Sequence, residues 1–279
     1  MRHHVHALGE ASPNGASSIP KLKSHTPFYA SHADLSRRFQ LQQADSPDID
    51  FTGEFFVPGK SGERIEQDHL ERYRFATAYG AGKDVLDIAC GVGYSAPMFI
   101  AGGAKSYLGV DLNEKQIRYA ASNYGDGAAE FAVGDICRFS PGRLFDLICC
   151  FETIEHVANY RDALHNLRRL VNRGGLLLVS SPNRPITSPN AASLSDRPSN
   201  EFHTQEFTPE ELIAELRSAG FEASINEVFG QRLRQHMPSW RLNQLKARIL
   251  GNPDEVSSPS VTPLNGKQPR YFVVVAKAS

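Results

Sequence analysis

The sequence has no long hydrophobic run, few cysteines and almost no net charge, and each absence excludes a class of protein. No segment approaches the roughly 18 consecutive apolar residues that a membrane-spanning helix needs. The formal net charge of the 279 residues is −1, whereas nucleic-acid-binding domains usually carry a basic surface. The four cysteines, Cys90, Cys137, Cys149 and Cys150, show neither CxxC nor zinc-ligand spacing. We therefore expect reduced, buried thiols in a cytoplasmic protein, with no nucleic-acid partner and no membrane span.

The N-terminal segment differs in composition from the rest of the chain. Residues 1–48 are polar and rich in Ser, His, Pro and Gln, which predicts a flexible tail. The opening residues MRHHVHALGEASPNG lack the apolar segment of a secretory signal, and we expect their histidines to be solvated rather than metal-bound. Residues 49–279 suffice for one sizeable α/β domain. Helical spacing of apolar residues predicts a helix over 61–79, which would cap this domain.

Strand-like and helix-like segments alternate from residue 84 onward. The strand-like runs VLDIA, SYLGVD, AEFAVG, FDLICCF and GLLLVSS occupy 85–89, 106–111, 129–134, 145–151 and 175–181. This alternation indicates βαβ units and a parallel sheet, and near-continuous apolar runs are typical of strands covered on both faces. EASINEVFG and RYFVVVAKA add two strands, and the last has no convincing crossover before it. The expected fold is therefore a doubly wound, seven-stranded Rossmann-like α/β sheet with its last strand antiparallel and helices on both faces.

The segment between the last two predicted strands, 230–268, reads as an insertion that could form a lid. It is locally basic through Arg232, Arg234, Arg241, Lys246 and Arg248. Such a segment suits an anionic acceptor such as a phosphorylated or carboxylated sugar, although a solvated helical face would have the same composition.

A glycine-rich turn lies in the stretch DVLDIACGVGYSA, between the first strand and the first helix that follows it. Gly91 and Gly93 would let the chain turn tightly and bring bare backbone close to a ligand. The following helix offers free N–H groups. Asp111 ends the next strand, where a carboxylate can accept hydrogen bonds from ribose hydroxyls. Ordinary turn glycines and a strand-end cap are the alternatives.

The same turn, GVGYSA, also satisfies the dinucleotide fingerprint G-x-G-x-x-G/A, so an NAD(P)-dependent oxidoreductase is one alternative. However, Asp87 would repel a pyrophosphate and would favour a ligand that carries an ammonium or sulfonium charge. Asp135, in GDI after the third strand, suits an adenine edge. No Tyr-x-x-x-Lys pair lies in the right region. A binding module that holds a nucleoside without catalysis is the second alternative.

Taken together, VLDIACGVG, LGVDL, GDI, FDLICCFETIEHV and GGLLLVSSPN resemble the class I S-adenosylmethionine-dependent methyltransferases over roughly residues 83–183. FTGEFFVPG…HLERYRFA and NEFHTQEFTPEEL resemble, more loosely, a bacterial subgroup that acts on small molecules or on sugars of surface polysaccharides. The resemblance implies S-adenosyl-L-methionine as donor, S-adenosyl-L-homocysteine as product, and a small-molecule or glycan acceptor methylated on oxygen. The sequence indicates neither the acceptor's identity nor an oligomeric state.

The resemblance also assigns cofactor-binding residues. The backbone from Ala89 to Gly93 would line the methionine moiety, and Asp87 would reach its ammonium group through water. Asp111 would bind the ribose. The remaining expected contacts are Leu112 against the adenine, Asp135 and Ile136 at the adenine rim, Phe151 near the sulfonium, and Tyr73 over the methionine end.

Two histidines are candidate general bases, because a hydroxyl acceptor must lose its proton and imidazole titrates near neutrality. His156 follows the fourth strand and His203 lies in the long polar loop 182–207; packing or hydrogen-bonding roles are the alternatives. Glu152, Glu155 and His156 form E-x-x-E-H, a pattern that resembles quinone-biosynthesis O-methyltransferases, some of which are metal-dependent. These groups could hold a divalent cation. Many relatives carry the Glu-His pair without one, so we expect no metal.

Overall fold

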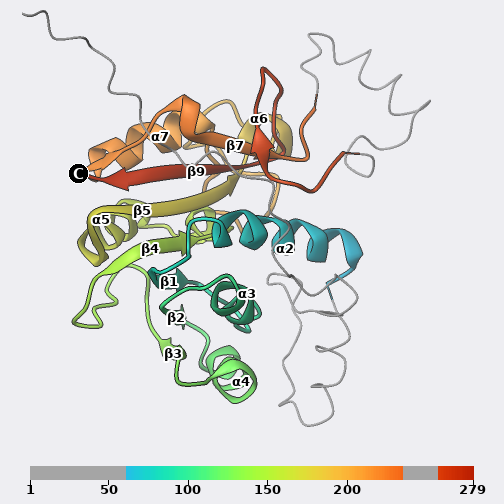
Figure 1. Ribbon diagram of the computed structural model, residues 1–279. Helices are drawn as coiled ribbons and strands as arrows, with labels where there is room; N and C mark the ends of the chain where they lie inside the picture. The colour runs from blue at the N-terminus through green and yellow to red at the C-terminus, as the bar shows by residue number, and fades with distance from the viewer. Residues whose placement is uncertain (1–60, 235–256) are drawn as a thin grey trace, which may run out of the picture.

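A computed structural model describes residues 61–234 and 257–279 (Figure 1). The expectations for the tail 1–48, and for Arg241, Lys246 and Arg248 in the insertion, lie outside these residues. Across both described ranges, no helix combines the length and apolar character that crossing a membrane requires.

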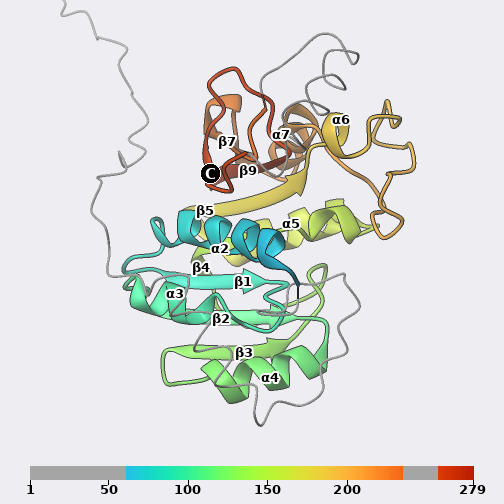
Figure 2. The same ribbon diagram turned by 90° about the vertical axis from the view of Figure 1, so that its right-hand side faces the viewer.

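One mixed sheet forms the centre of the molecule, with strands in the order β3-β2-β1-β4-β5-β9-β7-β8 (Figure 2). Neighbours among β1 to β5 pair in parallel, and β9 pairs antiparallel with β5 and β7. The predicted parallel sheet with an antiparallel last strand is therefore confirmed. The strands are β1 (Asp84–Ile88), β2 (Ser106–Asp111), β3 (Ala129–Val133), β4 (Phe145–Cys150), β5 (Val171–Pro182), β6 (Phe221–Glu222), β7 (Val228–Gln231), β8 (Thr262–Pro263) and β9 (Tyr271–Ala278).

The segment EASINEVFG is not the single strand that its apolar spacing predicts. Its first residue, Glu222, forms β6 together with the preceding Phe221, and β6 pairs with the end of β9. A 3₁₀ turn, Ile225–Glu227, then interrupts the chain before β7 pairs with the middle of β9. The prediction was wrong because the chain meets β9 twice, at two separate places, and must leave the sheet between them.

Helices cover both faces of the sheet, as the apolar runs of the strands predict. On one face α2 and α3 pack with alternate strand residues such as Val85 and Leu147, and on the other α5 and α7 pack with Leu86 and Ile148. The period of two along β1 and β4 places these neighbours on opposite faces. The helices are α2 (Glu63–Thr77), α3 (Ala96–Ala101), α4 (Glu114–Tyr124), α5 (Tyr160–Leu170), α6 (Arg184–Thr187) and α7 (Pro209–Ser218).

Two helix starts follow directly from local sequence. The Asn113 side chain accepts hydrogen bonds from Lys115 N and Gln116 N at the start of α4. Thr208 forms a capping box with Glu211 at the start of α7. These caps fix the residues at which α4 and α7 begin. They therefore fix where the loops after β2 and β5 end.

A buried polar network fastens α2 to the C-terminal half of the domain. Arg72 donates to Gln231 Oε1 at 2.7 Å, and Gln231 Nε2 donates to the carbonyl of Asp68 at 2.8 Å. Arg232 donates to Asp68 Oδ1 at 2.7 Å. Arg232 is 3% exposed, so it belongs to this network and not to a solvated basic face of the insertion.

The parallel strands place the ligand-binding edge of the sheet. β1 lies between β2 and β4, so the order of the sheet reverses at β1, and ligands of such folds bind outside the carboxyl ends of the strands at this point. The glycine turn, Asp111 and the segment Phe151–His156 follow β1, β2 and β4, so all of them reach this edge.

Gly93 provides a test of the packing behind the turn. Its φ is +76°, and a Cβ there would lie 2.7 Å from both the Ala120 Cβ and the Phe131 Cε1. Gly103 has a φ of +84° with no atom within 4 Å of an added Cβ. Gly103→Ala should lower the free energy of unfolding by about 1–2 kcal/mol, the cost of a left-handed backbone. Gly93→Ala should carry the same backbone cost and lower the free energy of unfolding by about a further 1–3 kcal/mol, because the added Cβ overpacks the core. Chemical denaturation measures both, and equal losses would contradict this packing.

Candidate functional site

A cavity of about 690 Å³ opens at the carboxyl edge of the sheet. Its walls come from α2, the turn after β1, the end of β2, the segment after β4, the loop after β5 and the start of β9. The structure brings most of the predicted site residues together in this cavity, namely Tyr73, Ala89, Gly91, Asp111, Leu112, Phe151, His156 and His203.

The turn after β1 presents backbone to the cavity in a left-handed conformation. Ala89 has a φ of +64° and Gly91 a φ of +58°. A Cβ at Gly91 would lie 3.7 Å from Gln116 Oε1, so φ rather than space requires glycine here. Ala89 adopts the same region despite its side chain, and such strain clusters at ligand sites.

Asp111 connects this turn to the end of β2. Its Oδ2 accepts a hydrogen bond from Gly91 N at 2.9 Å, and its Oδ1 accepts one from Asn113 N at 2.8 Å. Burial raises the pKa of its carboxyl group, and these backbone donors counter the rise. A carboxylate offers about four acceptor positions, so Asp111 can still accept hydrogen bonds from a diol.

Asp87 lies behind the cavity wall, fully buried. It accepts hydrogen bonds from the hydroxyls of Ser95, Tyr107 and Tyr73, at 2.6, 2.9 and 3.0 Å. Burial raises the pKa of Asp87 to about 6, and the three hydroxyls moderate the rise. Tyr73 lines the cavity itself and therefore links the buried carboxyl group to the cavity surface.

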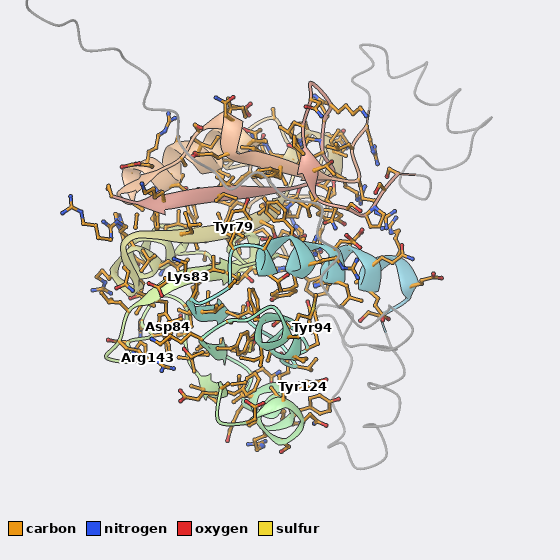
Figure 3. The ribbon with its side chains drawn as sticks, viewed as in Figure 1. Tyr79, Lys83, Asp84, Tyr94, Tyr124 and Arg143 are labelled. Atoms are coloured by element: carbon orange, nitrogen blue, oxygen red, sulfur yellow. The ribbon has the colours of Figure 1, made fainter. Side chains whose placement is uncertain are left out.

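Aromatic rings from α2 and the glycine turn form one wall of the cavity. Tyr94, which Figure 3 shows beside α2 and α3, stacks edge-on against Tyr73 with centroids 5.2 Å apart. The Tyr94 hydroxyl lies 3.0 Å from His69 Nδ1. Tyr73 also meets Phe151 edge-on at 5.1 Å. His69 and Tyr94 were not among the residues predicted from the sequence. The helical spacing from His69 to Tyr73 is the one signal that indicates the histidine.

Glu152 begins the segment after β4 with a left-handed φ of +47°. The Ser180 hydroxyl accepts from Glu152 N at 2.9 Å and donates to Glu152 Oε1 at 2.7 Å. Arg72 Nη1 lies 3.8 Å from the same Oε1. β5 and α2 therefore hold this turn in place, a role that the E-x-x-E-H pattern did not predict.

His156 and His203 meet across the cavity with ring centroids 4.8 Å apart and planes at 86°. His156 Nδ1 lies 3.1 Å from the Phe202 carbonyl, which can only accept, so this nitrogen carries the proton and Nε2 keeps its lone pair. Burial and the neighbouring His203 lower the pKa of His156. A neutral imidazole at pH 7 follows.

The second imidazole has a carboxylate partner. His203 Nδ1 lies 2.7 Å from Glu206 Oε1, and His203 Nε2 lies 2.9 Å from Asn200 Nδ2. Burial raises the pKa of Glu206, but hydrogen bonds from His203 and Thr187 outweigh it, and the net pKa is lowered. Glu206 therefore accepts the Nδ1 proton, and His203 Nε2 accepts from Asn200.

Hydrogen bonds hold the loop after β5, which carries His203, against the backbone of the turn after β4. Thr204 donates to the Glu155 carbonyl through its backbone N and its hydroxyl, at 2.8 and 2.9 Å. Gln205 Nε2 donates to the Ile154 carbonyl at 2.7 Å. The contact between His156 and His203 depends on these hydrogen bonds, and no local sequence pattern predicts them.

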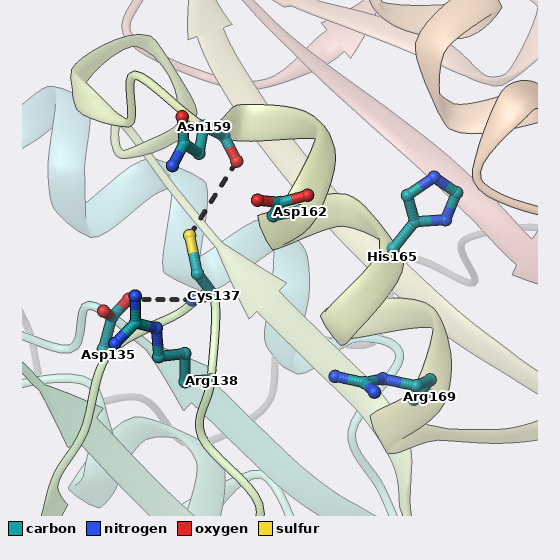
Figure 4. Close-up of a pocket in the computed structure, with 7 residues that line it drawn as sticks. All are labelled: Asp135, Cys137, Arg138, Asn159, Asp162, His165 and Arg169. Carbon is teal, nitrogen blue, oxygen red and sulfur yellow. Dashed lines mark hydrogen bonds between the residues drawn. The ribbon is translucent and has the colours of Figure 1, made fainter.

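Asp135 and Ile136 do not line this cavity. Asp135 lines a separate pocket of about 390 Å³ with Cys137, and its Oδ1 accepts from Cys137 N at 2.8 Å (Figure 4). The Ile136 carbonyl accepts from Asn166 Nδ2 at 2.9 Å. Gly93 also lies outside the cavity lining, because it faces Ala120 and Phe131.

A family model and individual relatives among known proteins match this chain. Residues 64–224 match the model of a methyltransferase domain family. A probable S-adenosylmethionine-dependent methyltransferase of Mycolicibacterium smegmatis is 32% identical over 176 residues, which are 62% of this chain and 66% of that protein. A ubiquinone biosynthesis O-methyltransferase of Thiobacillus denitrificans is 32% identical over 155 residues, 51% of this chain and 66% of that protein. The chain thus spans about two thirds of the length of these curated relatives.

A solved structure shares the fold. The N-methyltransferase NodS from Bradyrhizobium japonicum, crystallised with S-adenosyl-L-homocysteine, superposes with a TM-score of 0.53 at 17% identity. The match covers 86% of this chain and 98% of that one. At this identity the likeness concerns the fold alone.

Asp87 should leave a signature in the pH dependence of stability. Its pKa is about 6 in the folded protein and near 3.8 as a free side chain. Between these values the folded state keeps a proton that the unfolded state has lost, so stability falls as pH rises through this window, by about 3 kcal/mol in total. Denaturant unfolding at pH 4 and pH 7 gives the free energy of unfolding of the wild type and of Asp87→Asn. The wild type should lose stability relative to the variant between the two pH values. A difference that stays constant would refute the raised pKa.

Proposed function

Because the chain belongs to the class I S-adenosylmethionine-dependent methyltransferases, we propose that it transfers a methyl group from S-adenosyl-L-methionine to a hydroxyl group of a small molecule or glycan. The observation that carries the hydroxyl assignment is the imidazole pair, His156 and His203, in the same cavity as the glycine turn and Asp111. An amine acceptor has less need of a neighbouring proton acceptor than a hydroxyl.

The donor would lie along the carboxyl edge of the sheet. The backbone at Ala89 and Gly91 would contact the methionine moiety, and Asp111 would accept hydrogen bonds from the ribose hydroxyls. The electron-rich faces of Tyr73 and Phe151 suit a sulfonium cation. Leu112 is 74% exposed beside Asp111 and offers an apolar surface for adenine. Asp135 and Ile136 follow the neighbouring strand β3, and their contact with the adenine rim remains a prediction.

Methyl transfer to a hydroxyl makes one bond and breaks one. The acceptor oxygen attacks the methyl carbon, the carbon–sulfur bond breaks, and the sulfonium becomes a neutral thioether. The hydroxyl proton passes to an imidazole Nε2. His156 is the better proton acceptor, because its Nδ1 proton is held by the Phe202 carbonyl, whereas His203 Nε2 already accepts from Asn200. The protein otherwise contributes position and a cavity walled by aromatic rings.

Membership of a methyltransferase family argues against the NAD-dependent alternative. A module that holds the nucleoside without catalysis would need no facing imidazoles, so the pair also favours an enzyme. The relatives include an O-methyltransferase and the fold neighbours an N-methyltransferase. The acceptor therefore has to be found by experiment.

Binding calorimetry tests the donor. The wild type should bind S-adenosyl-L-methionine and S-adenosyl-L-homocysteine but not NAD. Asp111→Ala should weaken both affinities by roughly tenfold or more, because a hydrogen bond to a charged group contributes about 1.5–3 kcal/mol. Glu114→Ala is the matched control, since Glu114 is exposed and pairs with Arg118 on the surface of α4. Binding of NAD alone would overturn the assignment.

Release of S-adenosyl-L-homocysteine tests the acceptor class. Chelator-treated protein is incubated with phenols, catechols, free sugars and amines. A hydroxyl compound should be methylated, and His156→Asn should lower kcat by roughly 10²–10⁴ with little change in KM. His165→Asn, on α5 in the separate pocket, should leave kcat unchanged. Methylation of amines alone, at a rate indifferent to His156→Asn, would contradict the proposal.

A further inference from the structure

Three potential metal ligands converge in the cavity. Glu155, His156 and His203 each offer one ligand atom, and these atoms lie within 4.8 Å of one another. We propose that they form a binding site for a divalent first-row transition-metal ion, with one carboxylate and two imidazoles as ligands. This set differs from the one that the E-x-x-E-H pattern suggested, and it reverses our expectation of no metal.

Glu155 supplies the first independent observation. Its side chain is 1% exposed, yet its Oε2 has no hydrogen-bond partner among the residues that the structure describes. An unpartnered buried carboxyl oxygen costs free energy that a bound cation would offset. The Glu155 backbone carbonyl, by contrast, accepts from Thr204, so the residue is held in position while its Oε2 atom lacks a partner.

The two imidazoles supply the second observation. Metal-bound histidines donate the proton of the other ring nitrogen to a carbonyl or carboxylate, which fixes the tautomer and the ring orientation. His156 Nδ1 faces the Phe202 carbonyl at 3.1 Å, and His203 Nδ1 faces Glu206 at 2.7 Å. Both Nε2 atoms thus keep the lone pair that a metal requires. A bound ion would replace Asn200 at His203 Nε2.

Glu152 is excluded from the set by its own contacts. Its Oε1 accepts from Ser180 at 2.7 Å and lies 3.8 Å from Arg72. A carboxylate that already neighbours a guanidinium is a poor additional ligand. The third ligand comes instead from the loop after β5, which the hydrogen bonds of Thr204 and Gln205 hold against the turn after β4.

The ligand types indicate which ions the site prefers. Mg²⁺ and Ca²⁺ prefer all-oxygen ligands, whereas imidazole suits Zn²⁺, Fe²⁺, Co²⁺ and Ni²⁺. When bound in this cavity, such an ion supplies a Lewis acid for the acceptor oxygen. That use rests on the proposed function. Ion binding itself does not rest on the proposed function. The two histidines serve as proton acceptors only in the metal-free protein.

Cobalt titration of the 279-residue chain tests the site. The chain carries His3, His4 and His6 near its start, so the reference protein has all three replaced by alanine and is first treated with chelator. Co²⁺ should bind with 1:1 stoichiometry by calorimetry and produce visible d–d absorption, and Zn²⁺ should displace it. Mg²⁺ should bind much more weakly.

Substitutions then identify the ligands. Glu155→Gln and His203→Asn should each weaken Co²⁺ binding by at least about tenfold, since even the loss of an outer-shell partner costs 10–100-fold. Glu152→Gln and His165→Asn should bind Co²⁺ as the reference protein does. Circular dichroism checks folding, and two ligand variants keep the test valid if one of them fails to fold.

Several outcomes would overturn this inference. These are no Co²⁺ binding to the reference protein, unchanged affinity in folded Glu155→Gln and His203→Asn, and equal weakening by Glu152→Gln. Binding of S-adenosyl-L-methionine is measured in the same samples. Retained donor binding without Co²⁺ binding would refute the metal site alone, whereas loss of donor binding would refute the proposed function.

Discussion

The buried carboxyl group of Asp87 is the constraint on which the site depends. It lies on β1 and accepts hydroxyl donors from Tyr73 on α2, from Ser95 before α3 and from Tyr107 on β2. Four segments therefore share one buried polar centre. Because a buried carboxyl group is costly without such donors, each segment has to be in position for the others to be tolerated. The aromatic wall formed by Tyr73, Tyr94 and Phe151 is a consequence of this arrangement.

Strain lies at the carboxyl ends of the two adjacent strands β1 and β4. Ala89 and Glu152 both have positive φ values, and each follows the end of its strand almost directly. Hydrogen bonds around them hold these conformations, from Gly91 N to Asp111 after β1 and from Ser180 to Glu152 after β4. The left-handed turns direct the chain toward the cavity, which Ala89 and Glu152 both line.

Local patterns were sufficient for the sheet and for the residues that meet at the end of β1. Apolar runs located β1 to β5, and the glycine turn and Asp111 followed from their places at strand ends. The long-range pairings around the cavity could not be derived this way. The pairing of His156 with His203, and of Arg72 with Gln231, joins residues far apart in sequence through bonds to backbone carbonyls and buried amides. Such contacts depend on the folded path of the loops, for which single-sequence patterns carry no signal. Asp135 shows the converse case, because a suitable residue type at a strand end lines a neighbouring pocket instead.

The network that joins α2 to β7 also affects the order in which the protein can form during synthesis. Arg72, Asp68 and the Asp68 carbonyl bond to residues 159 to 164 positions later in the chain. The helix that carries Tyr73 and His69 therefore leaves the ribosome long before its anchoring partners do. Contacts of such high sequence separation form late and slow folding. Until β7 and Arg232 are made, α2 lacks the bonds that Arg72 and Asp68 form with them, and the cavity is completed only when nearly the whole domain has emerged.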